Sequence, residues 1–184
     1  MKEQDVFADV EGYELWFKEN DKLYMSELDA IRRVLPKSGQ GVEIGSGSGL
    51  FAFPLGIKIG IEPSPQMRKK ARERGIETLE GVAESLPVPD AAYDFALMVT
   101  ADCFLRDIRL AFLEIRRILK KEGFLIIAFL DRAAPLGQAY EQKKQQSIYY
   151  KNAQISFLRG NNSDFAENRF CGRRKTADGF FFAK

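Results

Sequence analysis

The residues best suited to chemistry are a group of glycines that follows a carboxylate, Glu43, within residues 41–49. The glycines lie at alternate positions along the chain: Gly45, Gly47 and Gly49. Glycine lets the backbone approach a ligand closely and adopt a positive φ at little cost. A buried strand, a glycine-rich turn and a helix commonly cradle a nucleotide-like cofactor. We therefore expect such a cofactor here, with the helix beginning at residues 50–53.

A second carboxylate, Glu62, ends the next apolar segment, about 17 residues after Gly45. Neighbouring parallel strands would bring Glu62 beside the glycine turn. Its two acceptor oxygens suit the vicinal hydroxyls of a ribose. The alternative role is an acid at a helix N-terminus, where it would interact favourably with the helix dipole. The position after a second strand favours the ribose contact.

The spacing of the glycines indicates which cofactor is expected. A dinucleotide-binding turn has the pattern G-x-G-x-x-G, but Leu50 stands where the third glycine belongs. The chain instead has E-x-G-x-G-x-G from Glu43 to Gly49. This pattern resembles motif I of the class I S-adenosylmethionine-dependent methyltransferases. A plain tight turn is the alternative interpretation of the pattern taken alone.

Two later segments extend the resemblance to about residues 41–130. Residues 81–90 are similar to the segment that carries the adenine site in this family, with Val82 in place of a common acid. Residues 116–127 resemble the family's helix exit and fifth strand. The resemblance implies S-adenosylmethionine as the cofactor. The implied contacts are Glu43, Gly45, Ser46, Gly47 and Gly49 for methionine, Glu62 for ribose, and Ala83 and Glu84 for adenine, with Pro63 and Thr100 as further cofactor contacts.

Apolar segments alternate with helical ones, which predicts an α/β fold whose parallel sheet is covered on both faces. The expected strands lie near residues 41–45, 57–61, 77–80, 93–99 and 123–129. The resemblance implies a Rossmann-like sheet with strand order 3-2-1-4-5. Residues 13–35 have helical periodicity, as one helix or a broken pair that Pro36 ends. We expect its aromatic residues to pack on the sheet, with a cofactor or substrate pocket as the alternative: Tyr13, Trp16, Phe17 and Tyr24.

Composition excludes several other classes. The chain has 184 residues, 45% of them hydrophobic, which suits one domain. It contains no histidine, which excludes histidine-based triads and histidine metal sites. Cys103 and Cys171 form no C-x-x-C pair, and a formal charge of +2 gives no indication of nucleic-acid binding. We expect a cytoplasmic monomer or weak dimer with no membrane span and no metal.

We interpret residues 1–153 as a methyltransferase domain and residues 154–184 as an irregular tail. The domain includes an N-terminal helical cap, about 1–36, and a polar segment, about 131–153, that forms either a lid or a surface helix. Because the tail lacks the expected patterns, strands 6 and 7 of the family are expected to be missing. A back-translation read one base later from Gln154 permits an amphipathic helix, so an out-of-frame reading is one hypothesis and a native tail the other.

Methyl transfer from a sulfonium is compatible with a chain that has no histidine. The methyl carbon is already activated, and positioning alone can supply roughly 7–11 kcal/mol of barrier reduction. The predicted function is transfer of a methyl group from S-adenosylmethionine to a small-molecule acceptor by in-line displacement. The alternatives are a non-catalytic S-adenosylmethionine-binding protein and, less favoured, an NAD-dependent oxidoreductase. No catalytic residue or acceptor is assigned.

Overall fold

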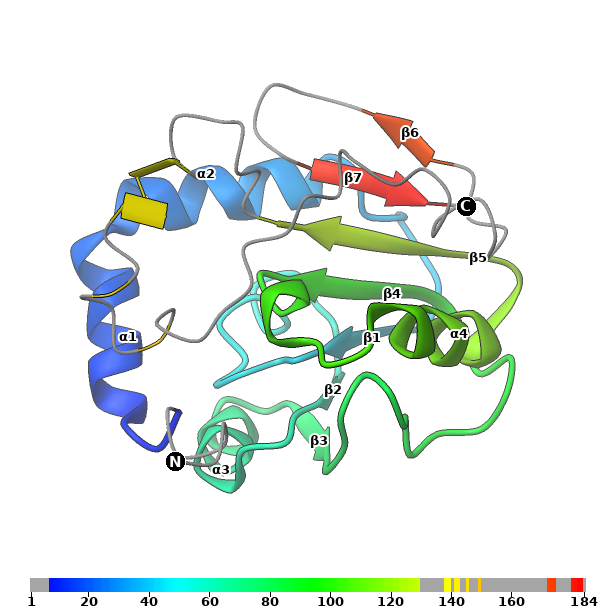
Figure 1. The fold of residues 1–184 in the computed structure, drawn as a ribbon, viewed down its shortest axis with the longest axis horizontal. Helices are drawn as coiled ribbons and strands as arrows, with labels where there is room; N and C mark the ends of the chain where they lie inside the picture. Colours follow the sequence, from blue (N-terminus) through cyan, green and yellow to red (C-terminus); the bar gives the residue numbers. More distant parts are fainter. Residues whose placement is uncertain are drawn as a thin grey trace.

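A central sheet organises the molecule, and helices lie on both sides of it (Figure 1). The computed structural model describes residues 7–129, positions 138–139, 141–142, 145 and 149, and the backbone of 172–174 and 180–183. The strands are β1 (Gly41–Ile44), β2 (Ile59–Ile61), β3 (Glu77–Leu79), β4 (Tyr93–Val99), β5 (Leu119–Ala128), β6 (Gly172–Arg174) and β7 (Phe180–Ala183). The helices are α1 (Val10–Glu19), α2 (Asp21–Arg32), α3 (Pro65–Glu73), α4 (Ile108–Ile118) and the short 3-10 helix η2 (Asp102–Phe104).

The strand order is β3-β2-β1-β4-β5-β7-β6. The first five strands run parallel, which confirms the expected α/β fold and the order 3-2-1-4-5. Along β4, the consecutive residues Leu97 and Met98 belong to different hydrophobic clusters, because alternate side chains of a strand point to opposite faces. α4 covers the Met98 face, and α2 and α3 contribute to the Leu97 face.

The N-terminal helices form the broken pair, with Asn20 between them. The side chain of Asp9 caps α1 by accepting a hydrogen bond from the Gly12 N–H at 2.9 Å. α2 buries Leu28 and Ile31, whereas α1, every residue of which the structure describes, buries none. α1 therefore contributes to the molecule mainly through partly exposed side chains.

The helix expected to begin at residues 50–53 is absent, so that prediction is wrong. The chain makes a series of turns from Leu50 to Gly56, in which the Phe53 N–H donates to the Gly49 carbonyl. Pro54 has no N–H to continue a helical ladder, and Gly56 has a positive φ of 75°. These two residues end the helical geometry after about one turn.

The expectation that strands 6 and 7 are missing is also wrong. β7 pairs antiparallel with β5, from Leu125 opposite Ala183 to Ala128 opposite Phe180. β6 in turn pairs antiparallel with β7, so β5 is not an edge strand. β2 and β3 are equally short, but motif residues adjoin them, whereas residues 172–174 and 180–183 match no family motif and are too few for periodicity alone to predict a strand.

Several sequence-based expectations remain predictions. Of the proposed lid at 131–153, only positions 138–139, 141–142, 145 and 149 are among the described residues. Apart from β6 and β7, residues 154–184 lie outside them, and the out-of-frame reading stays a hypothesis. No helix within the described part of the chain is both long and apolar enough to span a bilayer.

Candidate active site

A cavity of about 470 Å³ lies where β1, β2 and β4 end at the carboxyl edge of the sheet. Its wall includes Gly45 after β1, Glu62 after β2 and Thr100 after β4. Ligands bind at this edge in open α/β sheets because the loops there diverge and leave a crevice. The size lies in the ordinary range for small-molecule sites.

The glycine turn folds tightly below this cavity. Gly45, Gly47 and Gly49 have φ values of 72°, 53° and 80°, a region that residues with a Cβ atom rarely adopt. The Gly45 N–H donates to the Ile61 carbonyl at 2.8 Å, which ties the turn to β2. A Cβ on Gly45 would lie 2.6 Å from the Cβ of Ala101, so this position also needs glycine for space.

Glu62 is held at the wall of the cavity by backbone donors. Its carboxylate accepts hydrogen bonds from the Gly47 N–H at 2.9 Å and the Ser64 N–H at 2.8 Å. Burial raises the pKa of Glu62, while these two N–H groups and Arg68 act in the opposite direction. Each carboxylate oxygen keeps a lone pair for a further donor such as a hydroxyl.

Arg68, on α3, supports the segment that carries Glu62. Its guanidinium donates to the Glu62 and Pro63 carbonyls, each at 2.8 Å, and to the Glu80 carboxylate at 2.7 Å. The side chain is 8% exposed, so these bonds satisfy a charge that is largely removed from water. Arg68 thus fixes the chain between β2 and α3.

The segment after β3 forms another part of the wall. Val82, Ala83 and Glu84 line the cavity together with Leu110 from α4. The Glu84 carboxylate accepts hydrogen bonds from the Arg106 N–H at 2.7 Å and the Asp107 N–H at 3.3 Å. Glu84 therefore joins this segment to the start of α4, in addition to lining the cavity.

Thr100 has a strained backbone at the end of β4. Its φ is 48°, which is unusual for a β-branched residue. Its N–H donates to the Ala128 carbonyl at 2.7 Å, and its carbonyl accepts from the Cys103 thiol at 3.1 Å. Cys103 is buried and does not line the cavity, so its side chain contributes to packing. The strain turns the chain across the cavity immediately after β4.

Seven of the ten expected cofactor contacts lie on the cavity wall, and three lie behind it. The seven are Gly45, Gly47, Glu62, Pro63, Ala83, Glu84 and Thr100. The other three are Glu43, Ser46 and Gly49, which pack under the turn. Glu43 is 1% exposed, and burial raises the pKa of its carboxyl well above the usual range, which favours the protonated form. Its role as a direct ligand contact remains a prediction.

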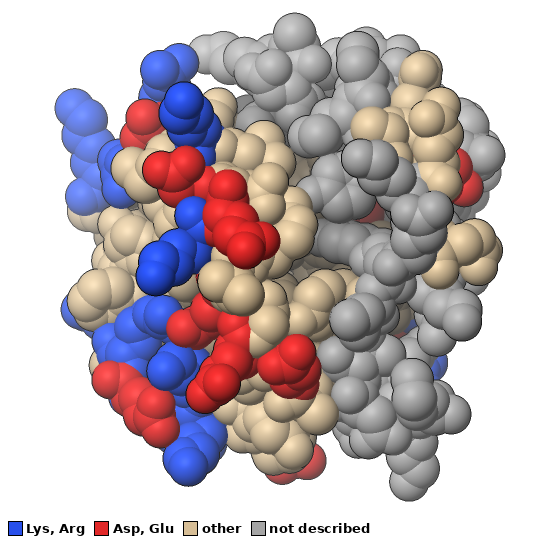
Figure 2. Space-filling view, turned by 90° about the vertical axis from the view of Figure 1, so that its left-hand side faces the viewer, with Lys and Arg blue, Asp and Glu red and all other residues tan. Residues whose placement is uncertain are grey.

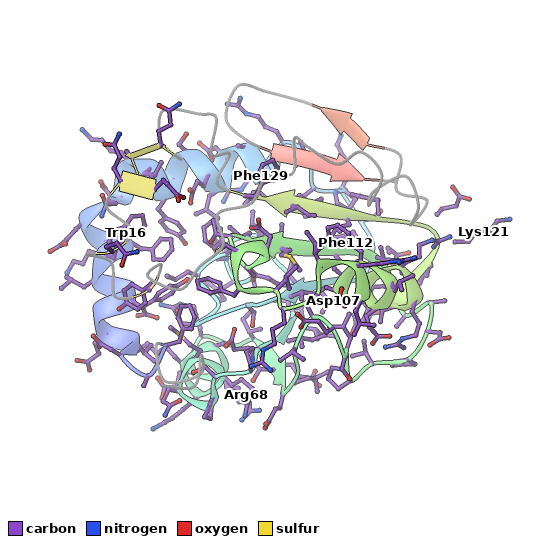
Figure 3. All side chains as sticks on the ribbon, in the orientation of Figure 1. Trp16, Arg68, Asp107, Phe112, Lys121 and Phe129 are labelled. Atoms are coloured by element: carbon purple, nitrogen blue, oxygen red, sulfur yellow. The ribbon has the colours of Figure 1, made fainter. Side chains whose placement is uncertain are left out.

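Aromatic side chains complete the cavity. Tyr13, Trp16 and Phe17 of the N-terminal helix line it, and Phe17 also packs against the hydrophobic cluster on the Leu97 face of the sheet. Contact of these rings with a cofactor or substrate remains a prediction. Tyr24 instead packs on Phe51, with 5.4 Å between ring centroids. Figure 3 shows Trp16 on α1 and Asp107 at the start of α4, two helices that both contribute to this cavity.

Three aromatic residues of the cavity were not predicted from the sequence: Phe7, Phe104 and Tyr149. Phe104 follows the fourth strand, where the family resemblance implies residues that face the transferred methyl group, and Tyr149 belongs to the segment 131–153 expected to form a lid or a surface helix. No local pattern predicts that these rings meet Phe7, so only the folded structure brings the three together.

Comparison with known proteins agrees with this geometry. Residues 42–127 match the family model described as "Methyltransferase domain". The structure is similar to that of an S-adenosylmethionine-dependent methyltransferase, a possible histamine N-methyltransferase, from Thermotoga maritima, with a TM-score of 0.89 and 39% identity over 97% of both chains. The chain belongs to the S-adenosylmethionine-dependent methyltransferases.

Two proteins from other organisms are similar in sequence over most of this chain. An uncharacterized protein of Methanocaldococcus jannaschii is 44% identical over 143 residues, which cover 78% of this chain and 69% of that protein. The uncharacterized methyltransferase YcgJ of Bacillus subtilis is 32% identical over 146 residues, 73% of this chain and 51% of that one. This methyltransferase chain thus spans about half to two thirds of the length of these relatives.

Proposed function

We propose that the protein binds S-adenosylmethionine in the cavity and transfers its methyl group to a small-molecule acceptor by in-line displacement. The observation that supports this most is the position of Glu62, which presents a carboxylate at the cavity wall directly beside the glycine turn. Ribose hydroxyls can donate to that carboxylate.

The described residues fit the cofactor in shape and in charge. Gly45 and Gly47 bring bare backbone to the cavity wall, where the methionine portion would lie. Val82, Ala83 and Leu110 offer apolar surface for adenine. When bound, S-adenosylmethionine supplies a methyl group on a positively charged sulfur, which a nucleophile can displace.

The chain's own contribution is mainly positioning. The sequence has no histidine to act as a general base. The space beside the glycine turn is bounded by the strained turn at Thr100 and by the aromatic rings of the N-terminal region. Holding a nucleophile in line with the breaking bond can lower the barrier by roughly 7–11 kcal/mol. An acceptor that is already nucleophilic would need no further activation.

Several features support a small acceptor. The cavity is of small-molecule size, and the Thermotoga relative's name suggests a small amine as its acceptor. Among the described residues on the face seen in Figure 2, Lys and Arg side chains are intermixed with Asp and Glu, rather than gathered into a basic patch. A nucleic acid would favour such a patch. The monomeric or weakly dimeric state stays a prediction.

The alternative of a non-catalytic cofactor-binding protein depended on missing C-terminal strands. Because β6 and β7 complete the sheet, that reason no longer applies. The oxidoreductase alternative is disfavoured by Leu50, which replaces the third glycine of the dinucleotide pattern.

Cofactor binding can be measured through Trp16, which is the chain's single tryptophan and lines the cavity. We expect S-adenosylmethionine to change its fluorescence at micromolar concentrations and NADH to bind far more weakly. Glu62→Gln should weaken cofactor binding by about 1–3 kcal/mol, because a hydrogen bond to a charged group is lost. Glu77→Gln, at an exposed site on β3, is the matched control. Unchanged affinity in Glu62→Gln would remove the ribose assignment.

A further inference from the structure

Four aromatic rings form one continuous part of the cavity lining, which we call the aromatic wall: Phe7, Tyr13, Phe104 and Tyr149. Phe7 stacks on Tyr149 with 5.9 Å between centroids and meets Phe104 nearly at a right angle at 5.2 Å. Tyr13 is nearly perpendicular to both Phe7 and Tyr149. Rings from four separate positions in the chain therefore present π surfaces and edges in several directions.

The wall is close to the place where the methyl group would be transferred. A Cβ built on Gly47 would lie 3.4 Å from the Tyr13 hydroxyl, so this ring adjoins the glycine turn. The Ser64 hydroxyl donates to the Phe7 carbonyl at 3.5 Å, which places the other end of the wall beside the segment after Glu62. An acceptor next to the methyl group would therefore touch these rings.

Acidic side chains outnumber basic ones among the described residues that line the cavity. Three of these residues carry a carboxylate, Glu62, Glu84 and Asp107, and one carries a basic group, Arg106. Removal of the Tyr13 hydroxyl from water, together with the nearby Glu62 carboxylate, raises the pKa of this hydroxyl, which therefore stays protonated and neutral. An aromatic ring has a negative face that attracts cations, and the neighbouring carboxylates add to the attraction.

We propose that the aromatic wall is an ammonium-recognition site and that the methyl acceptor is an organic amine. The proposal rests on the methyl-transfer function above and specifies its substrate class. An acceptor that is itself a carboxylate would be repelled by the acidic lining, and an uncharged apolar acceptor would make no use of it.

The charge balance of the reaction explains why such a wall is useful. The amine enters after losing a proton to water, and its nitrogen lone pair forms the new N–C bond while the C–S bond breaks. The bonding pair stays on sulfur, so sulfur becomes neutral and the positive charge passes to nitrogen. The aromatic wall then stabilises a charge that develops on nitrogen in the transition state and persists in the methylammonium product.

A matched pair of probes separates charge from shape. Choline carries a quaternary ammonium, and 3,3-dimethylbutan-1-ol has the same shape with a carbon in place of the nitrogen. We would titrate each by calorimetry into protein saturated with S-adenosylhomocysteine, whose sulfur is uncharged, so that no sulfonium charge of the cofactor repels the probe. We expect choline to bind at least tenfold more tightly than its isostere.

Variants then locate the preference. Phe104→Leu and Tyr149→Leu keep apolar bulk but remove a π face, and each should reduce the choline preference by about threefold or more without changing the affinity for the isostere. Phe124→Leu is the control, because Phe124 stacks on Phe95 and does not line the cavity. Two substitutions at different positions protect the test against a folding defect in either one.

The outcomes are distinguishable. Equal affinities for the two probes, no measurable choline binding, or a preference that survives both leucine variants would overturn the amine proposal and leave cofactor binding intact. Failure of S-adenosylhomocysteine itself to bind would overturn the proposed function and the amine proposal with it.

Discussion

Replacement of Gly45 by alanine tests two separate demands of the glycine turn. The φ of 72° costs an L-residue roughly 1–2 kcal/mol, because its Cβ approaches the backbone too closely. The new Cβ would also lie 2.6 Å from the Cβ of Ala101, and overpacking of this kind costs about 1–3 kcal/mol. We therefore expect Gly45→Ala to lose about 2–5 kcal/mol of the free energy of unfolding.

Gly56→Ala is the matched control, because it isolates the first of these costs. Gly56 has nearly the same φ, 75°, but a Cβ there would meet nothing within 4 Å. It should lose only about 1–2 kcal/mol. The double variant Gly45→Ala/Ala101→Gly removes the Ala101 Cβ that the new side chain would meet. It should therefore recover most of the difference in unfolding free energy between Gly45→Ala and Gly56→Ala.

Urea denaturation followed by Trp16 fluorescence gives the free energy of unfolding for each variant. Cofactor titration of the same samples should show weaker binding for Gly45→Ala, which alters the cavity wall, and unchanged binding for Gly56→Ala. Equal destabilisation by the two alanines, or no recovery in the double variant, would refute the contact argument.

Three further predictions concern residues outside the cavity lining. Burial raises the pKa of Glu27 from 4.5 to about 7, so the free energy of unfolding falls as the pH rises from 4.5 to 7. Glu27→Gln should therefore be more stable than the parent by about 1–3 kcal/mol at pH 8 but by little at pH 5. Urea denaturation at both pH values measures the difference. Arg68→Met should lower the free energy of unfolding by about 2 kcal/mol, because the Glu62 and Pro63 carbonyls lose their hydrogen-bond donor. It should also weaken cofactor binding, and wild-type affinity in calorimetry would contradict this. Phe112→Ala, at a fully buried site on α4, should cost about 3–5 kcal/mol in denaturation while a folded sample keeps its cofactor affinity.

The parallel core of the fold could be predicted from the sequence because its signals are local. β1, the glycine turn and Glu62 lie within about twenty residues, and each has a residue type that its backbone or its ligand requires. Seven expected contacts accordingly line the cavity. Glu43 was placed by motif alone, and motifs do not distinguish a carboxylate that meets a ligand from one that packs under the turn.

Features that depend on distant pairing could not be predicted. Phe7 and Tyr149 stack across 142 positions of sequence, and no periodicity reports such a contact. β6 and β7 are defined by pairing with β5 and with each other, and no family motif adjoins them as it adjoins the equally short β2 and β3. Turns replace the expected helix after Gly49 because Pro54 has no N–H to donate and Gly56 adopts a positive φ.

The absence of buried side chains in α1 has a consequence for the energetics of ligand binding. Tyr13, Trp16 and Phe17 face the cavity, so a ligand that fills it supplies the apolar contacts that hold this helix. α1 would then open on its own more readily than the sheet, and its amide hydrogens would exchange early in the free protein and slowly in the complex. The ligand would act as part of the hydrophobic core for one helix, and binding and local folding would be the same event.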